Sequence, residues 1–76
     1  MAAILVIEDD LTFSRILEGF LQKQGFQVRV AHRGLEGLKL FLAHPADLVL
    51  LDYRLPDTSG MEILTEIKKS SPGTPV

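Results

Sequence analysis

Two short apolar runs, each followed at once by carboxylates, constrain the fold of this chain more than any other feature. Residues 4–7 lead directly into Glu8 and Asp9, and residues 48–51 lead directly into Asp52. Short runs rich in branched residues are typical of strands buried on both faces of a parallel sheet. Parallel strands of one sheet end on the same side, so we expect Glu8, Asp9 and Asp52 to lie together at a ligand-binding edge.

Three carboxylates that converge without fixed cationic partners repel one another, and a hard divalent cation is the usual remedy. We therefore predict a Mg²⁺ or Mn²⁺ site at this edge. Asp10 is interpreted differently, as a first-turn helix charge whose side chain need not face the site. His32 and His44 are interpreted as solvated loop or helix-end residues, because no partner spacing around them supports catalysis.

Composition excludes several classes of protein. The 76 residues are 46% hydrophobic, which argues against a disordered tail, and they include no cysteine, which excludes disulfides and thiolate metal sites. The net charge is −2, and no basic block exists beyond Lys68 and Lys69, so we expect no direct nucleic-acid binding by this segment. The start lacks a cationic region and its apolar run is too short for a signal peptide or membrane span, which favours a cytoplasmic location without membrane contact.

The remaining pattern alternates between helix and strand. A first helical stripe consists of Phe13, Ile16, Leu17, Phe20 and Leu21, and a second of Leu35, Leu38, Phe41 and Leu42. Residues 26–30 alternate as in a half-exposed edge strand, and Ser59 with Glu62 forms a capping box that opens a third helix. The predicted order is β-α-β-α-β-α with residues 75–76 beginning another strand. We expect Phe13, Phe20 and Phe41 to lie in the core.

These residues resemble the receiver domain of two-component response regulators. The matching segments are Ile4-Leu5-Val6-Ile7-Glu8-Asp9-Asp10, Ala31-His32-Arg33-Gly34-Leu35-Glu36-Gly37-Leu38, Asp47-Leu48-Val49-Leu50-Leu51-Asp52 and Leu55-Pro56-Asp57-Thr58-Ser59-Gly60-Met61-Glu62. The resemblance covers the whole chain. It implies an α/β, flavodoxin-like fold with parallel strand order 2-1-3, of which residues 1–76 are the N-terminal part.

The resemblance also implies a role for each site residue. Asp52 corresponds to the aspartate that accepts a phosphoryl group from a sensor histidine kinase. Asp9 corresponds to a direct Mg²⁺ ligand, Glu8 to a second acidic residue that often acts through water, and Arg54 to a ligand through its backbone carbonyl. Such a module is a phosphoacceptor rather than an enzyme, and at most it phosphorylates itself from a donor with Mg²⁺.

Two site residues of the family, a Ser or Thr after the fourth strand and a Lys after the fifth, have no counterpart within the 76 residues. We therefore expect impaired phosphorylation. An alternative is a self-associating half-domain, an assembly unit without phosphotransfer. A third hypothesis, an aspartyl-phosphate-type hydrolase, is disfavoured by the same missing lysine and by the lack of a cap insertion.

The third strand also predicts assembly. Without a fourth strand beside it, the apolar run 48–51 is a sheet edge with unpaired backbone groups and no Lys or Pro to protect it. A 76-residue core is marginal, so burial by a partner is favourable. We expect a homodimer or larger assembly, either by pairing of third strands or by exchange of residues 55–76.

Overall fold

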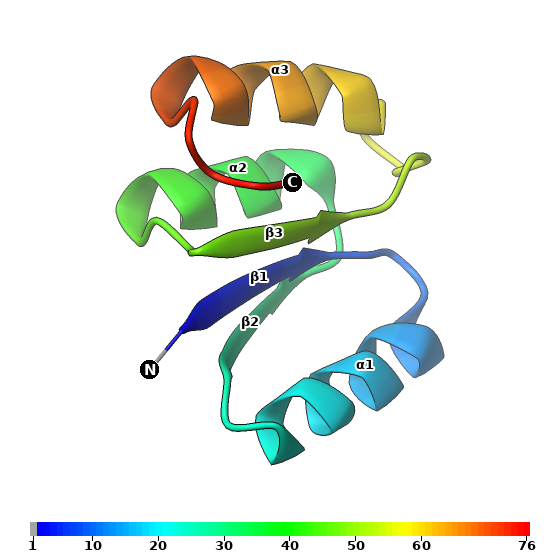
Figure 1. Ribbon diagram of the computed structural model, residues 1–76. Coiled ribbons are helices and arrows are strands. Elements are labelled where there is room, and N and C mark those ends of the chain that lie inside the picture. The colour runs from blue at the N-terminus through cyan, green and yellow to red at the C-terminus, as the bar shows by residue number, and fades with distance from the viewer. Residues whose placement is uncertain (1) are drawn as a thin grey trace.

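The computed structural model describes residues 2–76, which form a three-stranded parallel sheet with helices on both faces (Figure 1). The elements are β1 (Ala3–Ile7), α1 (Leu11–Lys23), β2 (Gln27–Ala31), α2 (Gly34–Ala43), β3 (Leu48–Leu51) and α3 (Gly60–Ser70). The strand order is β2-β1-β3. The predicted element order, parallel sheet and 2-1-3 strand order are confirmed.

The central strand β1 sets the register of the sheet. Val6 lies opposite Val30 on β2 and Leu50 on β3. Alternate residues of a strand point to opposite faces, so β1 contributes apolar side chains to both sides, and residues 4–7 are all buried. This explains why the first apolar run is continuous rather than alternating.

The two faces of the sheet are covered unequally. In Figure 1, α2 and α3 lie together on one side of the sheet and α1 lies alone on the other. The main core is on the two-helix side and consists of Leu5, Ile7, Phe41, Val49, Ile63 and Ile67. The α1 side is thinner, because α1 contacts β2 and no second helix of residues 2–76 lies beside it.

This unequal cover contradicts part of the predicted core. Phe41 is buried as expected, but the prediction for Phe13 and Phe20 is wrong: they are 51% and 59% exposed. Helical periodicity identifies an apolar stripe but not how many elements cover it. The expectation that β3 is buried on both faces also fails in part, since Leu50 and Leu51 are only half-buried while Val49 is fully buried.

The third helix starts largely as predicted. The Ser59 hydroxyl oxygen accepts a hydrogen bond from the Glu62 amide at 3.2 Å. The Glu62 carboxylate does not complete the capping box, because it accepts a bond from the Thr58 hydroxyl at 2.8 Å. Residues 75–76 are not a regular strand, but the Pro75 carbonyl accepts a bond from the Val49 amide at 3.0 Å, so this segment lies beside β3.

Candidate functional site

Three carboxylates meet where β1 and β3 end. Glu8, Asp9 and Asp52 each offer an oxygen, and these oxygens lie within 4.8 Å of one another. Glu8 and Asp52 are partly buried, whereas Asp9 is exposed. The predicted convergence of these three side chains is therefore confirmed, and it provides hard oxygen donors on one side of a potential cation position.

The sheet ladder positions two of these residues through their backbones. The Glu8 amide donates to the Ala31 carbonyl at 2.9 Å, and the Asp52 amide donates to the Ile7 carbonyl at 2.9 Å. Each bond continues the parallel ladder one residue past the end of a strand. Glu8 and Asp52 are therefore brought together by strand register rather than by flexible loops.

The electrostatics of the cluster favour a cation. Partial burial raises the pKa of Glu8; a hydrogen bond from the Asp10 amide, at 3.0 Å, opposes this rise, and the nearby charge of Asp52 adds to it. Full ionisation of the cluster is therefore costly. A divalent cation offsets that cost, and the oxygen donor set fits Mg²⁺ or Mn²⁺ better than softer metals.

Asp10 lies next to the cluster in sequence but has a different task. It is the N-cap of α1, and its carboxylate oxygen accepts a hydrogen bond from the Phe13 amide at 2.9 Å. This satisfies one of the free amides at the helix start. Asp10 thus serves the helix start, as predicted, but as the N-cap and not as a charge within the first turn.

A short closed loop follows Asp52. The Arg54 amide donates a long bond of 3.4 Å to the Asp52 carboxylate, and Arg54 forms an antiparallel bridge with Ser59. The Gly60 amide then donates to the Tyr53 carbonyl at 2.9 Å. A Cβ at Gly60 would lie 2.4 Å from the Asp52 carbonyl oxygen, so only glycine allows α3 to begin this close to β3. The metal-binding role of the Arg54 carbonyl stays a prediction.

Two polar contacts near the site were not predicted from the sequence. His32 is exposed as expected, but its Nδ1 lies 3.0 Å from the Glu8 carbonyl oxygen. Asp57, in the loop before α3, accepts hydrogen bonds from the Gly34 and Leu35 amides at the start of α2. One signal was available for Asp57: the position before α2 is Arg33, which is a poor N-cap, so a cap from elsewhere was needed.

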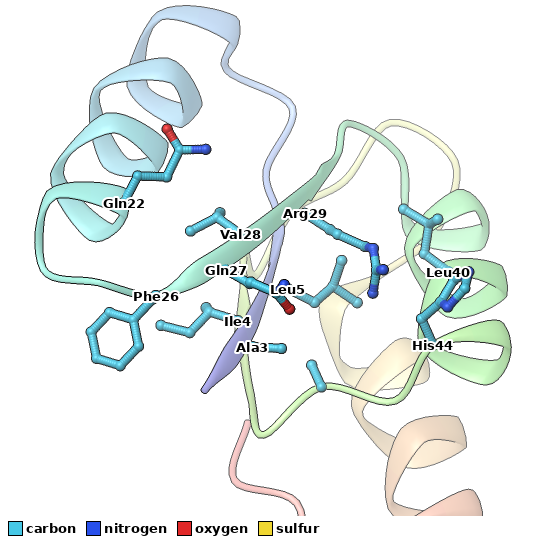
Figure 2. A pocket seen from close by; sticks show the side chains of 11 residues that line it. Ala3, Ile4, Leu5, Gln22, Phe26, Gln27, Val28, Arg29, Leu40 and His44 are labelled. Carbon is cyan, nitrogen blue, oxygen red and sulfur yellow. The ribbon is translucent and has the colours of Figure 1, made fainter. Parts of the chain in front are cut away.

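One hollow of the molecule lies away from the carboxylates. It has a volume of about 380 Å³ and is lined by residues at the opposite edge of the sheet, where β1 and β2 begin, including Ala3, Phe26 and Gln27 (Figure 2). His44, at the end of α2, also lines it. The clustered carboxylates therefore lie at the carboxyl edge of the sheet and do not line this hollow.

Comparison with known proteins decides the family. The family model for the response regulator receiver domain matches residues 4–76. The chain belongs to this family. The resemblance inferred from the acidic and loop motifs is thus confirmed.

Curated relatives are longer than this receiver chain. It is 40% identical over 73 residues to the transcriptional regulatory protein YkoG of Bacillus subtilis and to the transcriptional regulatory protein ZraR of Klebsiella oxytoca. Those matches cover 96% of this chain but only 32% and 16% of the two relatives. The receiver chain thus spans about a third or less of these relatives.

Solved structures agree on the fold. A CheY-like receiver domain protein from Methanospirillum hungatei superposes with a TM-score of 0.95 at 31% identity, covering 97% of this chain and 59% of that one. The response regulator TrrA from Thermotoga maritima, in complex with Mg²⁺-BeF, gives a TM-score of 0.90 at 38% identity, covering 95% of this chain and 63% of TrrA. TrrA has also been solved in complex with the histidine kinase ThkA.

Over residues 2–76, none of the helices combines the length and the apolar character needed to cross a membrane.

Proposed function

We propose that this receiver chain accepts a phosphoryl group from a sensor histidine kinase onto Asp52 with the help of Mg²⁺ or Mn²⁺. The observation that carries the proposal is the cluster of Glu8, Asp9 and Asp52 oxygens within 4.8 Å at the carboxyl edge of the sheet. The complexes of TrrA with Mg²⁺-BeF and with ThkA support the choice of cation and partner. Residues 1–76 are then the N-terminal part of a receiver domain, since they span only about three fifths of the solved receivers.

Each residue has a defined task in this proposal. An Asp52 carboxylate oxygen attacks the phosphorus of a phosphohistidine, the phosphorus–nitrogen bond breaks, and the imidazole leaves with the bonding electrons and takes up a proton. Asp52 then carries an acyl phosphate. Glu8, Asp9, Asp52 and the Arg54 carbonyl hold the cation. Bound Mg²⁺ supplies positive charge that neutralises and orients the phosphoryl group.

Labelling with acetyl phosphate tests this assignment. The chain is joined to the remaining segment of TrrA, exposed to acetyl phosphate and Mg²⁺, and weighed by mass spectrometry. We expect one phosphoryl group that hydroxylamine removes, as for an acyl phosphate, and no label in D52N. A label that persists in D52N, or that resists hydroxylamine, assigns the acceptor elsewhere.

We further infer that the 76 residues alone are phosphorylated slowly. The only ion pair among residues 2–76 joins Lys69 to Glu66, both on α3 and outside the acidic cluster. A site made of carboxylates alone lacks a cationic side chain to attract and hold a phosphoryl anion. The isolated chain should therefore label more slowly than the TrrA hybrid, and equal fast labelling contradicts this inference.

The position of β3 at the edge of the sheet favours a second role, self-association. The structure places β3 at the edge of the sheet, and Pro75 accepts the Val49 amide bond at this edge. In a polypeptide of these 76 residues, a second copy can extend the sheet or exchange residues 55–76, and cover exposed Phe13 and Phe20. Light scattering at micromolar concentration should show a dimer or larger species. A monomer whose β3 amides resist exchange excludes this role.

The assembly role and the phosphoacceptor role predict different metal behaviour. Phosphoacceptance needs Mg²⁺ affinity that falls when Asp9 is changed, whereas assembly alone does not. The cytoplasmic location, the absence of nucleic-acid binding by this segment and its classification as a phosphoacceptor rather than an enzyme stay predictions.

A further inference from the structure

Helix α2 begins without a cap of its own. Arg33 occupies the N-cap position in an extended conformation, and its side chain makes no capping hydrogen bond. The first amides of a helix have no intrahelical acceptor, so those of Gly34 and Leu35 need partners from elsewhere. Helix α2 contacts β1, the strand that leads into Glu8 and Asp9.

Asp57 supplies the missing acceptors from another element. One carboxylate oxygen accepts the Gly34 amide at 2.8 Å, and the other accepts the Leu35 amide at 2.9 Å. These two bonds, the one to Leu35 most strongly, lower the pKa of Asp57. Both oxygens of one carboxylate therefore join the loop before α3 to the positive end of α2.

Tight packing beside these bonds fixes the same contact. A Cβ at Gly34 would lie 2.3 Å from the Thr58 methyl carbon and 3.1 Å from a Leu55 methyl carbon. The loop thus rests directly on the α2 backbone, with no space for a side chain between them. Its position along α2 is set by both hydrogen bonds and contact.

The α2 start is connected to both halves of the acidic cluster. On one side, Asp57 belongs to the loop closed by the bridge between Arg54 and Ser59, and Arg54 donates to Asp52. On the other side, His32 lies two residues before α2 and its ring contacts the Glu8 carbonyl oxygen. The helix start is therefore connected to the end of β1 through His32 and to the end of β3 through the loop that contains Asp57.

We propose that Asp57 is a positioning residue of the phosphoacceptor site. By fixing the loop that follows Asp52 to α2, Asp57 holds Asp52 and the Arg54 carbonyl in the arrangement that binds the cation. This inference rests on the proposed function. Asp57 acts through the loop and touches neither the cation nor the phosphoryl group. Its removal should loosen the cluster even where α2 itself stays folded.

The test must separate positioning from simple helix capping. D57A removes the hydrogen bonds that both cap α2 and hold the loop before α3 against it. In D57A/R33S, serine at the N-cap restores a local cap for α2, but the loop still lacks its hydrogen bonds to the helix. D57N, which keeps one acceptor oxygen, is the milder variant in case D57A does not fold. D47A is the matched control, because Asp47 likewise accepts a backbone amide bond, from Ala3 at 2.7 Å, but at the opposite edge of the sheet.

Mn²⁺ affinity, measured by paramagnetic broadening of the Asp9 and Asp52 resonances, is the first readout. We expect D57A and D57A/R33S to bind Mn²⁺ about tenfold more weakly, as is typical when a residue that orients metal ligands is lost. D57N should lie between these variants and the wild type, and D47A should match the wild type. Recovery of full affinity in D57A/R33S would show that Asp57 is only a helix cap and would overturn the proposal.

Amide exchange gives a readout that does not depend on metal. The Gly60 amide, bonded to the Tyr53 carbonyl, should exchange faster in D57A/R33S than in the wild type and D47A, while the α2 amides keep their protection. If the wild type binds no Mn²⁺, the metal assignment under the proposed function fails, and this exchange measurement alone decides the role of Asp57. Unchanged Gly60 exchange refutes it.

Discussion

The carboxylate of Asp57 and the backbone amide of Gly34 are 23 residues apart in sequence and 2.8 Å apart in space. This bond joins the loop after β3 to the first turn of α2. It links two elements that flank the acidic cluster. Its energetic contribution can be isolated by pH, because only the ionised carboxylate has its full accepting capacity.

The stability of the chain should depend on pH through Asp57. Its folded-state pKa is lowered from the usual 3.8, first by the Leu35 amide, with a smaller contribution from the nearby charge of Arg33. A lowered pKa stabilises the fold fully above the unfolded value, and this stabilisation is lost as pH falls through the folded value. Urea unfolding should therefore show a gap in the free energy of unfolding between wild type and D57N. This gap should be constant near neutral pH and should narrow below pH 3.8. A gap that is independent of pH would contradict this.

Glycine substitutions should have opposite effects at two positions. Gly60→Ala places a Cβ 2.4 Å from the Asp52 backbone oxygen, so α3 and the end of β3 must separate. Such overpacking typically costs about 1–3 kcal/mol. Gly19, within α1, has nothing within 4 Å of the added Cβ, and Gly19→Ala should stabilise the helix by about 0.5–1 kcal/mol. Thermal unfolding of both variants tests the pair, and equal effects would show that Gly60 is not a close-approach position.

Two apolar residues of α3 should differ in their contribution to stability. Ile67 is fully buried in the core between sheet and helices, whereas Met61 is 55% exposed on the same helix. Ile67→Ala should cost about 2–5 kcal/mol, because it removes buried methyl groups and leaves a cavity. Met61→Ala should change stability by less than about 0.5 kcal/mol. Denaturant unfolding measures both stability changes. If the two substitutions cost similar free energies of unfolding, the described core is wrong.

Substitutions of the neighbouring residues Asp9 and Asp10 should separate metal binding from helix capping. Asp9→Asn removes a carboxylate from the cluster, so Mn²⁺ should bind more weakly and no longer raise the melting temperature. Asp10→Ala removes the α1 cap at Phe13 and should cost about 1 kcal/mol of stability while leaving Mn²⁺ affinity unchanged. Calorimetry with and without Mn²⁺ measures both effects. A weaker affinity in the Asp10 variant and not in the Asp9 variant would reverse the assignment.

Local sequence patterns were sufficient to predict the order of helices and strands and the acidic cluster. The continuous apolar run before Glu8 and the run before Asp52 predict buried parallel strands, and such strands must end on the same side of the sheet. The proximity of Glu8, Asp9 and Asp52 follows from that geometry alone. The placement of Asp10 at the start of α1 was also predicted, although as a first-turn charge and not as the N-cap that accepts the Phe13 amide.

The burial of individual side chains and the support of the site were decided only by tertiary structure. Phe13 and Phe20 follow the helical period, yet their exposure depends on what packs beside α1, and no local pattern contains that information. Asp57 caps a helix more than twenty residues away, a pairing that depends on how the loop after β3 lies across α2. Short-range propensities identify the elements of this chain, whereas contacts between distant elements depend on how those elements pack.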